Sequence, residues 1–161
     1  NKFLETSKNN STNKEINQLY VNIISLQTGN IIPEINLTAR NGSLKKNTDL
    51  SNKNSVIFVF WSYEQNSHQI GLFNRINRIL DNEINYDFHA ININVDNEKW
   101  ISVLNKYKNR AHFSHFRSVN FENMSKKMVL NNLNKAIITN EKGEITKILT
   151  INDLETYLNL N

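Results

Sequence analysis

The sequence predicts an α/β protein with a central mixed β-sheet flanked by helices, and three stretches carry this prediction. Residues 56–61 form an apolar run that is too short for a lone helix, which predicts a strand buried on both faces. Apolar residues then recur at helical spacing over 70–80, and a further strand pattern follows over 86–95. A strand–helix–strand order implies a right-handed crossover and a parallel strand pair.

Composition limits the domain count and the classes of partner. The chain has 161 residues, which suits one domain with a modest tail, and its 39% hydrophobic and 21% charged residues are ordinary for a globular protein. The net charge of +4 comes from scattered basic residues, so nucleic acid is not an expected partner. No stretch approaches the roughly 20 apolar residues that span a bilayer. We therefore expect membrane association only through a partner or an N-terminal anchor outside this sequence.

The N-terminal region predicts a tail followed by a helix. Residues 1–13 are polar and indicate a tail or linker. A helix is expected over 14–29, with Gly29 as its stop, and the α/β domain over 30–161. The helix has apolar residues on one face: Ile16, Leu19, Tyr20, Ile23 and Ile24. Such a face predicts packing on the domain or docking to another molecule.

A β-hairpin is expected before the buried strand. Residues 32–39 predict a strand, and the Asn41-Gly42 pair suits the positive-φ positions of a tight turn. Leu44 and Leu50 continue the chain after this turn. The predicted sheet therefore begins with an N-terminal hairpin.

The second half of the chain predicts the remaining elements. Asp96 or Asn97 can cap a helix that carries Trp100 and Leu104 on its apolar face. Residues 111–120 are less regular and predict a loop with a short extended piece, followed by a helix around 123–130. A hairpin closed at Gly143 is expected over 136–148, and a final helix over 151–160.

The junction between strand 56–61 and the next helix is the expected functional site, because a helix N-terminus presents unpaired N–H groups and a partial positive charge. The junction holds Phe60-Trp61-Ser62-Tyr63-Glu64-Gln65-Asn66-Ser67-His68. This segment resembles the active-site segment of TlpA/ResA-like envelope thiol-disulfide oxidoreductases, in which a Phe-Trp strand end leads into Cys-x-x-Cys. The resemblance extends in element order over about 32–160 and implies a thioredoxin-like fold.

On that pattern, Gln65 and His68 occupy the two cysteine positions, and the chain contains no cysteine. Thiol-disulfide chemistry needs a thiolate and a second sulfur. The resemblance also implies a cis-proline at the position of Asn134, whereas the only proline is Pro33. A non-prolyl cis bond costs about 2.5–4 kcal/mol, so the Leu133–Asn134 bond is expected to be trans. The absence of both cysteines and of the cis-proline predicts a domain that no longer reduces, forms or exchanges disulfides.

We therefore expect a redox-inactive binding or structural module with no enzymatic activity and no cofactor. The resemblance implies a bacterial envelope assembly, a protein partner and a periplasmic or outer-membrane-associated location. Besides the N-terminal helix, the predicted contact residues are those of the former active-site loop and its neighbour: Trp61, Tyr63, Glu64, Gln65, Ser67, His68 and Asn134. Trp61 and Trp100 are expected to serve mainly in packing.

Other chemistry is open to the same residues. A metal-dependent enzyme or metal-binding domain could use His68, His112 or His115, although no third ligand has a fixed offset from them. Ser67 beside His68 suggests a nucleophile and a base, but neighbouring helical positions do not face each other. A chaperone for extended peptides would need an open strand edge.

Overall fold

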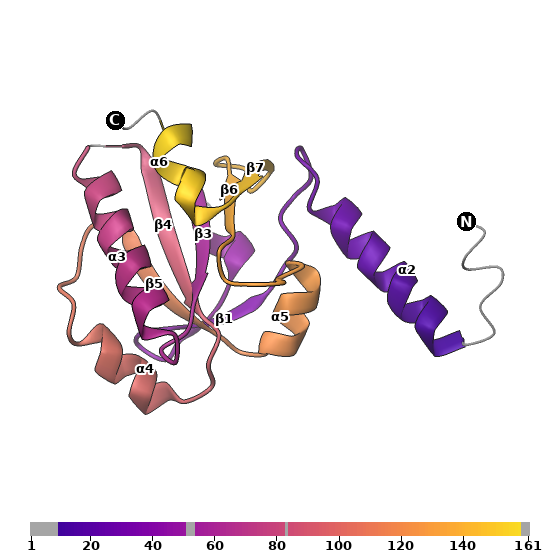
Figure 1. The fold of residues 1–161 in the computed structure, drawn as a ribbon, viewed down its shortest axis with the longest axis horizontal. Coiled ribbons are helices and arrows are strands. Elements are labelled where there is room, and N and C mark those ends of the chain that lie inside the picture. Colours follow the sequence, from indigo (N-terminus) through magenta and orange to yellow (C-terminus); the bar gives the residue numbers. More distant parts are fainter. Residues whose placement is uncertain (1–9, 51–53, 83, 159–161) are drawn as a thin grey trace.

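The computed structural model describes residues 10–50, 54–82 and 84–158, and within them it forms a seven-stranded mixed sheet of order β2-β1-β5-β4-β3-β6-β7 (Figure 1). The strands are β1 (Asn36–Ala39), β2 (Leu44–Lys46), β3 (Ser55–Trp61), β4 (Tyr86–Asn92), β5 (Phe113–Ser118), β6 (Ala136–Thr139) and β7 (Ile145–Leu149). The helices are α2 (Asn10–Ser25), α3 (Asn66–Leu80), α4 (Asn97–Leu104), α5 (Phe121–Lys127) and α6 (Leu154–Tyr157), and two 3₁₀ turns cover Asn47–Leu50 and Ile151–Asp153. The predicted α/β fold with a mixed sheet, an N-terminal hairpin and an extra N-terminal helix is confirmed.

The buried strand β3 lies inside the sheet, parallel to β4 and antiparallel to β6. All of its residues after Ser55 are buried, as an apolar run flanked on both faces requires. The predicted crossover unit is confirmed, because α3 connects β3 to its parallel neighbour β4. This arrangement brings the carboxyl ends of β3 and β4 to the same edge of the sheet.

Two apolar clusters cover the two faces of the sheet. Alternate residues of β3 divide between them, with Trp61 in the cluster beneath α3 and α4, and Phe60 in the cluster beneath α5 (Figure 1). Trp61 and Trp100 are fully buried, which confirms that both pack in the core. Phe73 of α3 makes edge contacts with Trp61 at a centroid distance of 5.0 Å. These contacts fix α3 over the end of β3.

The prediction for residues 111–120, a loop with a short extended piece, was right only in part, because a six-residue inner strand, β5, lies there. It pairs in parallel with β4 and antiparallel with β1. The polar side chains of this segment concealed the strand, whereas pairing on both edges satisfies its backbone. Phe113 and Phe116 anchor β5 to opposite faces of the sheet.

Several element ends also differ from the predicted ones. β4 ends at Asn92 and not at Val95, whose side chain is exposed. α5 covers Phe121–Lys127 and not 123–130, because the Asn120 side chain caps it by accepting from Asn123 N and Val129 has a positive φ of 47°. The helical region predicted over 151–160 is a 3₁₀ turn followed by α6, and its last two residues lie outside the described part of the chain. Asp96 caps α4 as predicted.

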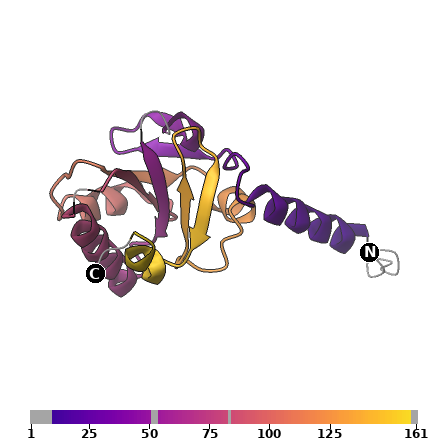
Figure 2. The same cartoon turned by 90° about the horizontal axis from the view of Figure 1, so that it is seen from above.

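α2 spans Asn10–Ser25, so it begins inside the stretch assigned to a tail (1–13) and ends before residue 29. At its end, Leu26 N and Gln27 N donate to carbonyls three residues back, and not four as in an α-helix. The side-chain amide of Asn30 also donates to Ile24 O at 2.8 Å and so satisfies one of the last carbonyls. Gly29, with φ 93°, lies in the following turn. α2 projects away from the sheet (Figures 1 and 2).

A buried histidine in β4 makes the stability of the fold depend on pH. Burial lowers the pKa of His89 to about 4, although nearby Asp87 opposes the shift. Between pH 6.5 and 4 the unfolded chain binds a proton that the folded protein excludes. The free energy of unfolding should therefore fall as the pH drops through this window.

Replacing His89 with Phe should reduce that fall, because the new ring keeps the edge contacts with Phe58 and Phe116 but does not titrate. The remaining fall is expected from His115, whose pKa is also lowered to about 4. Urea unfolding of both proteins, at pH values above and inside the window, measures the effect. An equal pH dependence in the variant would contradict the assignment.

Candidate functional site

The loop from Ser62 to Gln65 joins the carboxyl end of β3 to the N-terminus of α3. Gln65 is the N-cap residue, and its side chain makes no capping hydrogen bond. Its carbonyl accepts from Gln69 N at 2.9 Å, which is the first backbone bond of the helix. Since the earlier N–H groups of a helix lack acceptors in the helix itself, this end of α3 offers donors to a bound molecule.

A network of polar side chains holds this loop, with Ser62 and Asn92 buried and Asn94 partly buried. Asn94 Oδ1 accepts from Ser62 Oγ at 2.7 Å and from Tyr63 N at 3.1 Å. Ser62 Oγ in turn accepts from Glu64 N at 3.1 Å. Asn92, which is 0% exposed, accepts from Asn94 N at 3.0 Å and donates from Nδ2 to Asn94 Oδ1 at 3.3 Å, and so fixes the central side chain. The loop backbone is therefore tied to the end of β4 at several successive points.

The structure brings most of the predicted contact residues to the surface. Glu64, Gln65 and Ser67 are exposed, and Tyr63 and His68 are partly buried. Trp61 is an exception, because its side chain is 0% exposed and lies against Phe73. The assignment of Trp61 as a contact residue is corrected accordingly: an apolar ring at the end of β3 packs beneath the loop and supports it.

His68 and Asn134 lie together although 66 positions separate them in the chain. Both line a cavity of about 180 Å³, whose other walls include Ser67 and Arg75. Asn134 Oδ1 accepts from Ile151 N at 3.1 Å. The Leu133–Asn134 bond is trans, as predicted, since no described peptide bond is cis. A polar amide therefore occupies the place that the family resemblance assigns to a cis-proline.

Both ring nitrogens of His68 are shielded from solvent. Burial lowers its pKa, and within the described residues neither ring nitrogen has a hydrogen-bond partner. The Arg75 guanidinium on the cavity wall is bonded to Ile151 O and Asn152 O and lies 3.4 Å from a Glu155 oxygen. Because no described contact joins Ser67 to His68, the pair does not form a nucleophile and base.

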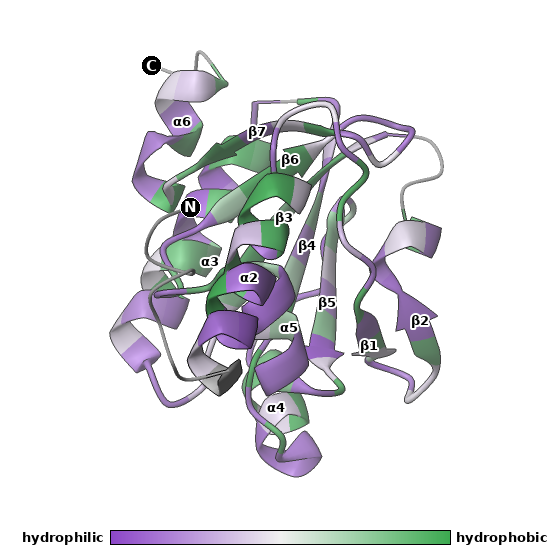
Figure 3. Cartoon of the chain, turned by 90° about the vertical axis from the view of Figure 1, so that its right-hand side faces the viewer, coloured by the Kyte–Doolittle hydropathy of each residue, from purple (hydrophilic) through white to green (hydrophobic). Residues whose placement is uncertain are grey.

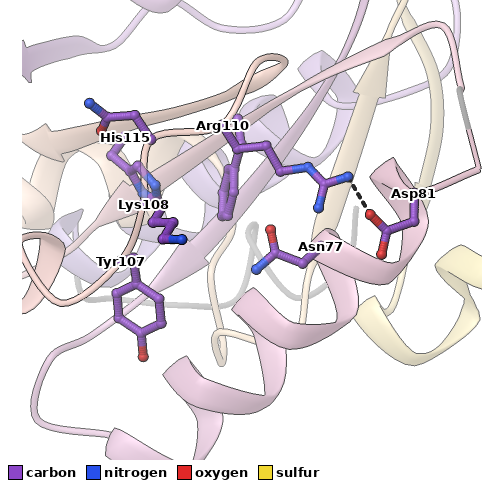
Figure 4. A pocket seen from close by; sticks show the side chains of 8 residues that line it. Asn77, Asp81, Tyr107, Lys108, Arg110 and His115 are labelled. Atoms are coloured by element: carbon purple, nitrogen blue, oxygen red, sulfur yellow. Dashed lines mark hydrogen bonds and ion pairs between the residues drawn. The ribbon is translucent and has the colours of Figure 1, made fainter.

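The three histidines considered for a metal lie in different settings. His112 is exposed, with Nδ1 2.7 Å from Asp87 Oδ1. His115 lines a separate cavity of about 400 Å³, in which Arg110 is bonded to Asp81 (Figure 4). Burial and the charge of Arg40 lower the pKa of His115 to about 4. Across the described ranges, no group of three or more His, Cys, Asp or Glu side chains could hold a metal ion.

Sequence reasoning missed the polar residues that organise the loop. Ser62, Asn92 and Asn94 were not singled out, and Arg75 was hidden in a helical pattern. The sequence did hold one signal for them: Asn92 and Asn94 come directly after the apolar residues of a strand that is parallel to β3. Side chains that follow neighbouring parallel strands meet at one edge of a sheet.

Neither a protein-family model nor a curated protein matches this chain. Among solved structures, a candidate thiol-disulfide oxidoreductase from Bacteroides vulgatus is similar with a TM-score of 0.70 and 11% identity, over 84% of this chain and 96% of that one. The thioredoxin domain of another thiol-disulfide oxidoreductase from B. vulgatus gives 0.64 and 16%, over 84% and 97%. A thiol:disulfide interchange protein from a Bacteroides species gives 0.60 and 16%, over 84% and 92%.

These similarities establish a thioredoxin-like fold, shared with thioredoxin domains of thiol-disulfide oxidoreductases. This chain has no cysteine, so it lacks the nucleophile that thiol-disulfide exchange requires. Among the described helices, none is both long enough and apolar enough to cross a bilayer.

Removing the central acceptor of the loop network should release the loop. In Asn94→Ala, the Ser62 hydroxyl and the Tyr63 amide lose their acceptor, and we expect a loss of about 1–3 kcal/mol in the free energy of unfolding. Amide hydrogen exchange should show lower protection at Tyr63 and Glu64. Asn66→Ala, at an exposed position beside the loop, is the control and should leave protection unchanged. Equal exchange in both variants would contradict a role for Asn94 in holding the loop.

Proposed function

We propose that this domain is a redox-inactive binding or structural module of a bacterial cell-envelope protein assembly. One observation carries the proposal: the loop at the N-terminus of α3 is fixed by a partly buried network of hydrogen bonds, yet the chain has no cysteine to perform chemistry there. A fixed loop loses little conformational freedom when it binds, so its rigidity favours recognition.

The surface around the loop suits a protein partner. Exposed polar side chains of Glu64, Gln65 and Ser67 lie between two hollows. One is the cavity with His68 and Asn134, and the other, of about 400 Å³, is lined by Tyr63 together with residues of α4. The side-chain amide of Asn134 can form hydrogen bonds with a partner, and neither it nor the neutral ring of His68 places a charge in this hollow.

The envelope location is supported by the resemblance of residues 60–68 to the active-site segment of envelope oxidoreductases. The similar solved structures include thiol-disulfide oxidoreductases of Bacteroides, and they share the fold on which that segment is presented. The chain thus has the fold of those proteins, and we assign to its loop a binding role in place of a catalytic one.

An insulin reduction assay tests the absence of redox activity. With dithiothreitol as reductant, the purified chain should not raise the rate above the reductant alone, because it has no thiolate to attack a disulfide. A thioredoxin with an intact Cys-x-x-Cys motif is the positive control. A rate comparable with that control would contradict the proposal.

A charge reversal tests the binding surface. Glu64→Lys should lower recovery of a co-purified envelope protein about tenfold, because an unfavourable charge then lies in the contact region. Glu141→Lys, an identical change in the exposed β6–β7 turn, should leave recovery unchanged. The chain should be purified from native membranes in both forms. A partner-free monomer, or equal recovery with both variants, would contradict the proposal.

A further inference from the structure

α2 contacts the domain along one narrow side. Asn22, only 8% exposed, donates from Nδ2 to Lys126 O of α5 at 2.9 Å, and Gln18 donates to Asn22 Oδ1 at 3.1 Å. Leu26, just beyond the helix end, is buried in the cluster beneath α5. The helix is therefore attached mainly through polar contacts and one leucine.

The apolar side chains of α2 face away from the domain. Their exposed fractions are large for such residues: Leu19 49%, Tyr20 62%, Val21 56%, Ile23 48% and Ile24 38%. Figure 3 is viewed from the side on which α2 projects and shows its hydrophobic stretches outside the sheet core. A contiguous exposed apolar patch of this kind marks an interaction site.

The exposed residues cover more than half of the helix circumference. At 3.6 residues per turn, the arc from Leu19 through Ile23, Tyr20 and Ile24 to Val21 spans about 200°. Asn22 lies at about 300° on the same scale, on the side held by the domain. The domain and the exposed arc thus divide the surface of α2 between them.

We propose that α2 inserts into an apolar groove of a partner protein, which covers this exposed arc while α5 covers the opposite side. An amphipathic helix laid in a hydrophobic groove is a common mode of recognition. A concave groove can contact side chains over an arc that a flat surface cannot cover. The proposal is independent of the loop surface, because α2 shares no residue with it.

A second copy of this chain fits the arc less well. Two helices packed face to face bury only the sides turned toward each other, which would leave Val21 or Leu19 in solvent. From Ile16 to Ile24 the helix rises about 12 Å. Over this length a helix pair buries only one side of each helix, whereas a groove can bury the whole arc.

The charge distribution on α2 favours a protein groove over a lipid surface. No acidic or basic residue occurs between Ile16 and Ser25, and the only cationic residue of the helix is Lys14. Helices that lie on membranes carry many Lys and Arg residues on their polar face. An uncharged arc also requires an apolar, uncharged groove, so binding should depend little on salt.

Photo-crosslinking in the native cell tests the geometry. A benzophenone amino acid at position 19, 20 or 21 should capture one and the same protein, since these positions sample the whole arc. The same group at position 142, in the exposed β6–β7 turn, should not capture it. Crosslinks to a second copy of this chain, to lipid, or to a different protein from each position would overturn the proposal.

Binding of the full chain to the captured, purified protein provides the decisive measurement. By calorimetry, Tyr20→Asp should weaken binding about thirtyfold or more. Thr156→Asp adds the same charge at an exposed position of α6 and should leave affinity unchanged, as should raising the salt concentration. Both variants should keep the wild-type circular dichroism spectrum, because both positions are exposed.

Two further measurements separate the competing occupants. Sedimentation of the purified chain should show a monomer, and a dimer that Tyr20→Asp dissociates would assign the arc to a second copy. Vesicles of phosphatidylcholine and phosphatidylglycerol should not bind the chain, and binding lost in Tyr20→Asp would assign the arc to lipid. Glu141→Lys, in the exposed β6–β7 turn, should leave the α2 affinity unchanged. Because α2 shares no residue with the loop surface, failure at one surface does not imply failure at the other.

Discussion

Burial of β3 on both faces is the constraint on which the rest of this structure depends. A strand with apolar residues on each side needs helices above and below it and paired strands at both edges. That requirement places α3 and α5 on opposite faces and leaves the carboxyl end of β3 as the place where the chain must turn. The loop from Ser62 to Gln65 is therefore a direct product of how the core is packed.

The fold could be predicted from the sequence because its signals are periodic and local. The apolar run of β3, the helical spacing of α3 and the Asn41-Gly42 turn each specify one element with little competition from other structures. β5 was predicted only as a short extended piece within a loop, because its polar side chains carry no clear alternation and pairing with β1 and β4 makes it an inner strand. Tertiary pairing is invisible to local pattern reasoning.

Site residues could be predicted where their place in the chain fixes their place in the fold. They could not be predicted where side-chain packing decides whether a residue is exposed. Gln65 and His68 follow β3 directly, and the family resemblance assigned Asn134 to the cis-proline position, which lies in the same cavity as His68. Trp61 differs because side-chain alternation turns it into the core. For α2, periodicity defined an apolar face, but only the contact between Asn22 and α5 shows that this face points outward.

The polar network under the loop adds geometry more than stability. Replacing both partners of a buried hydrogen bond with apolar groups of similar shape can be nearly neutral, so Ser62, Asn92 and Asn94 are not needed merely to keep the fold. What they supply is a defined loop conformation, because each bond fixes one backbone or side-chain position. In a catalytic relative such order would align reacting atoms. In a chain without a thiol, the same order holds the loop that carries Glu64, Gln65 and Ser67 in one conformation, as the proposed recognition role requires.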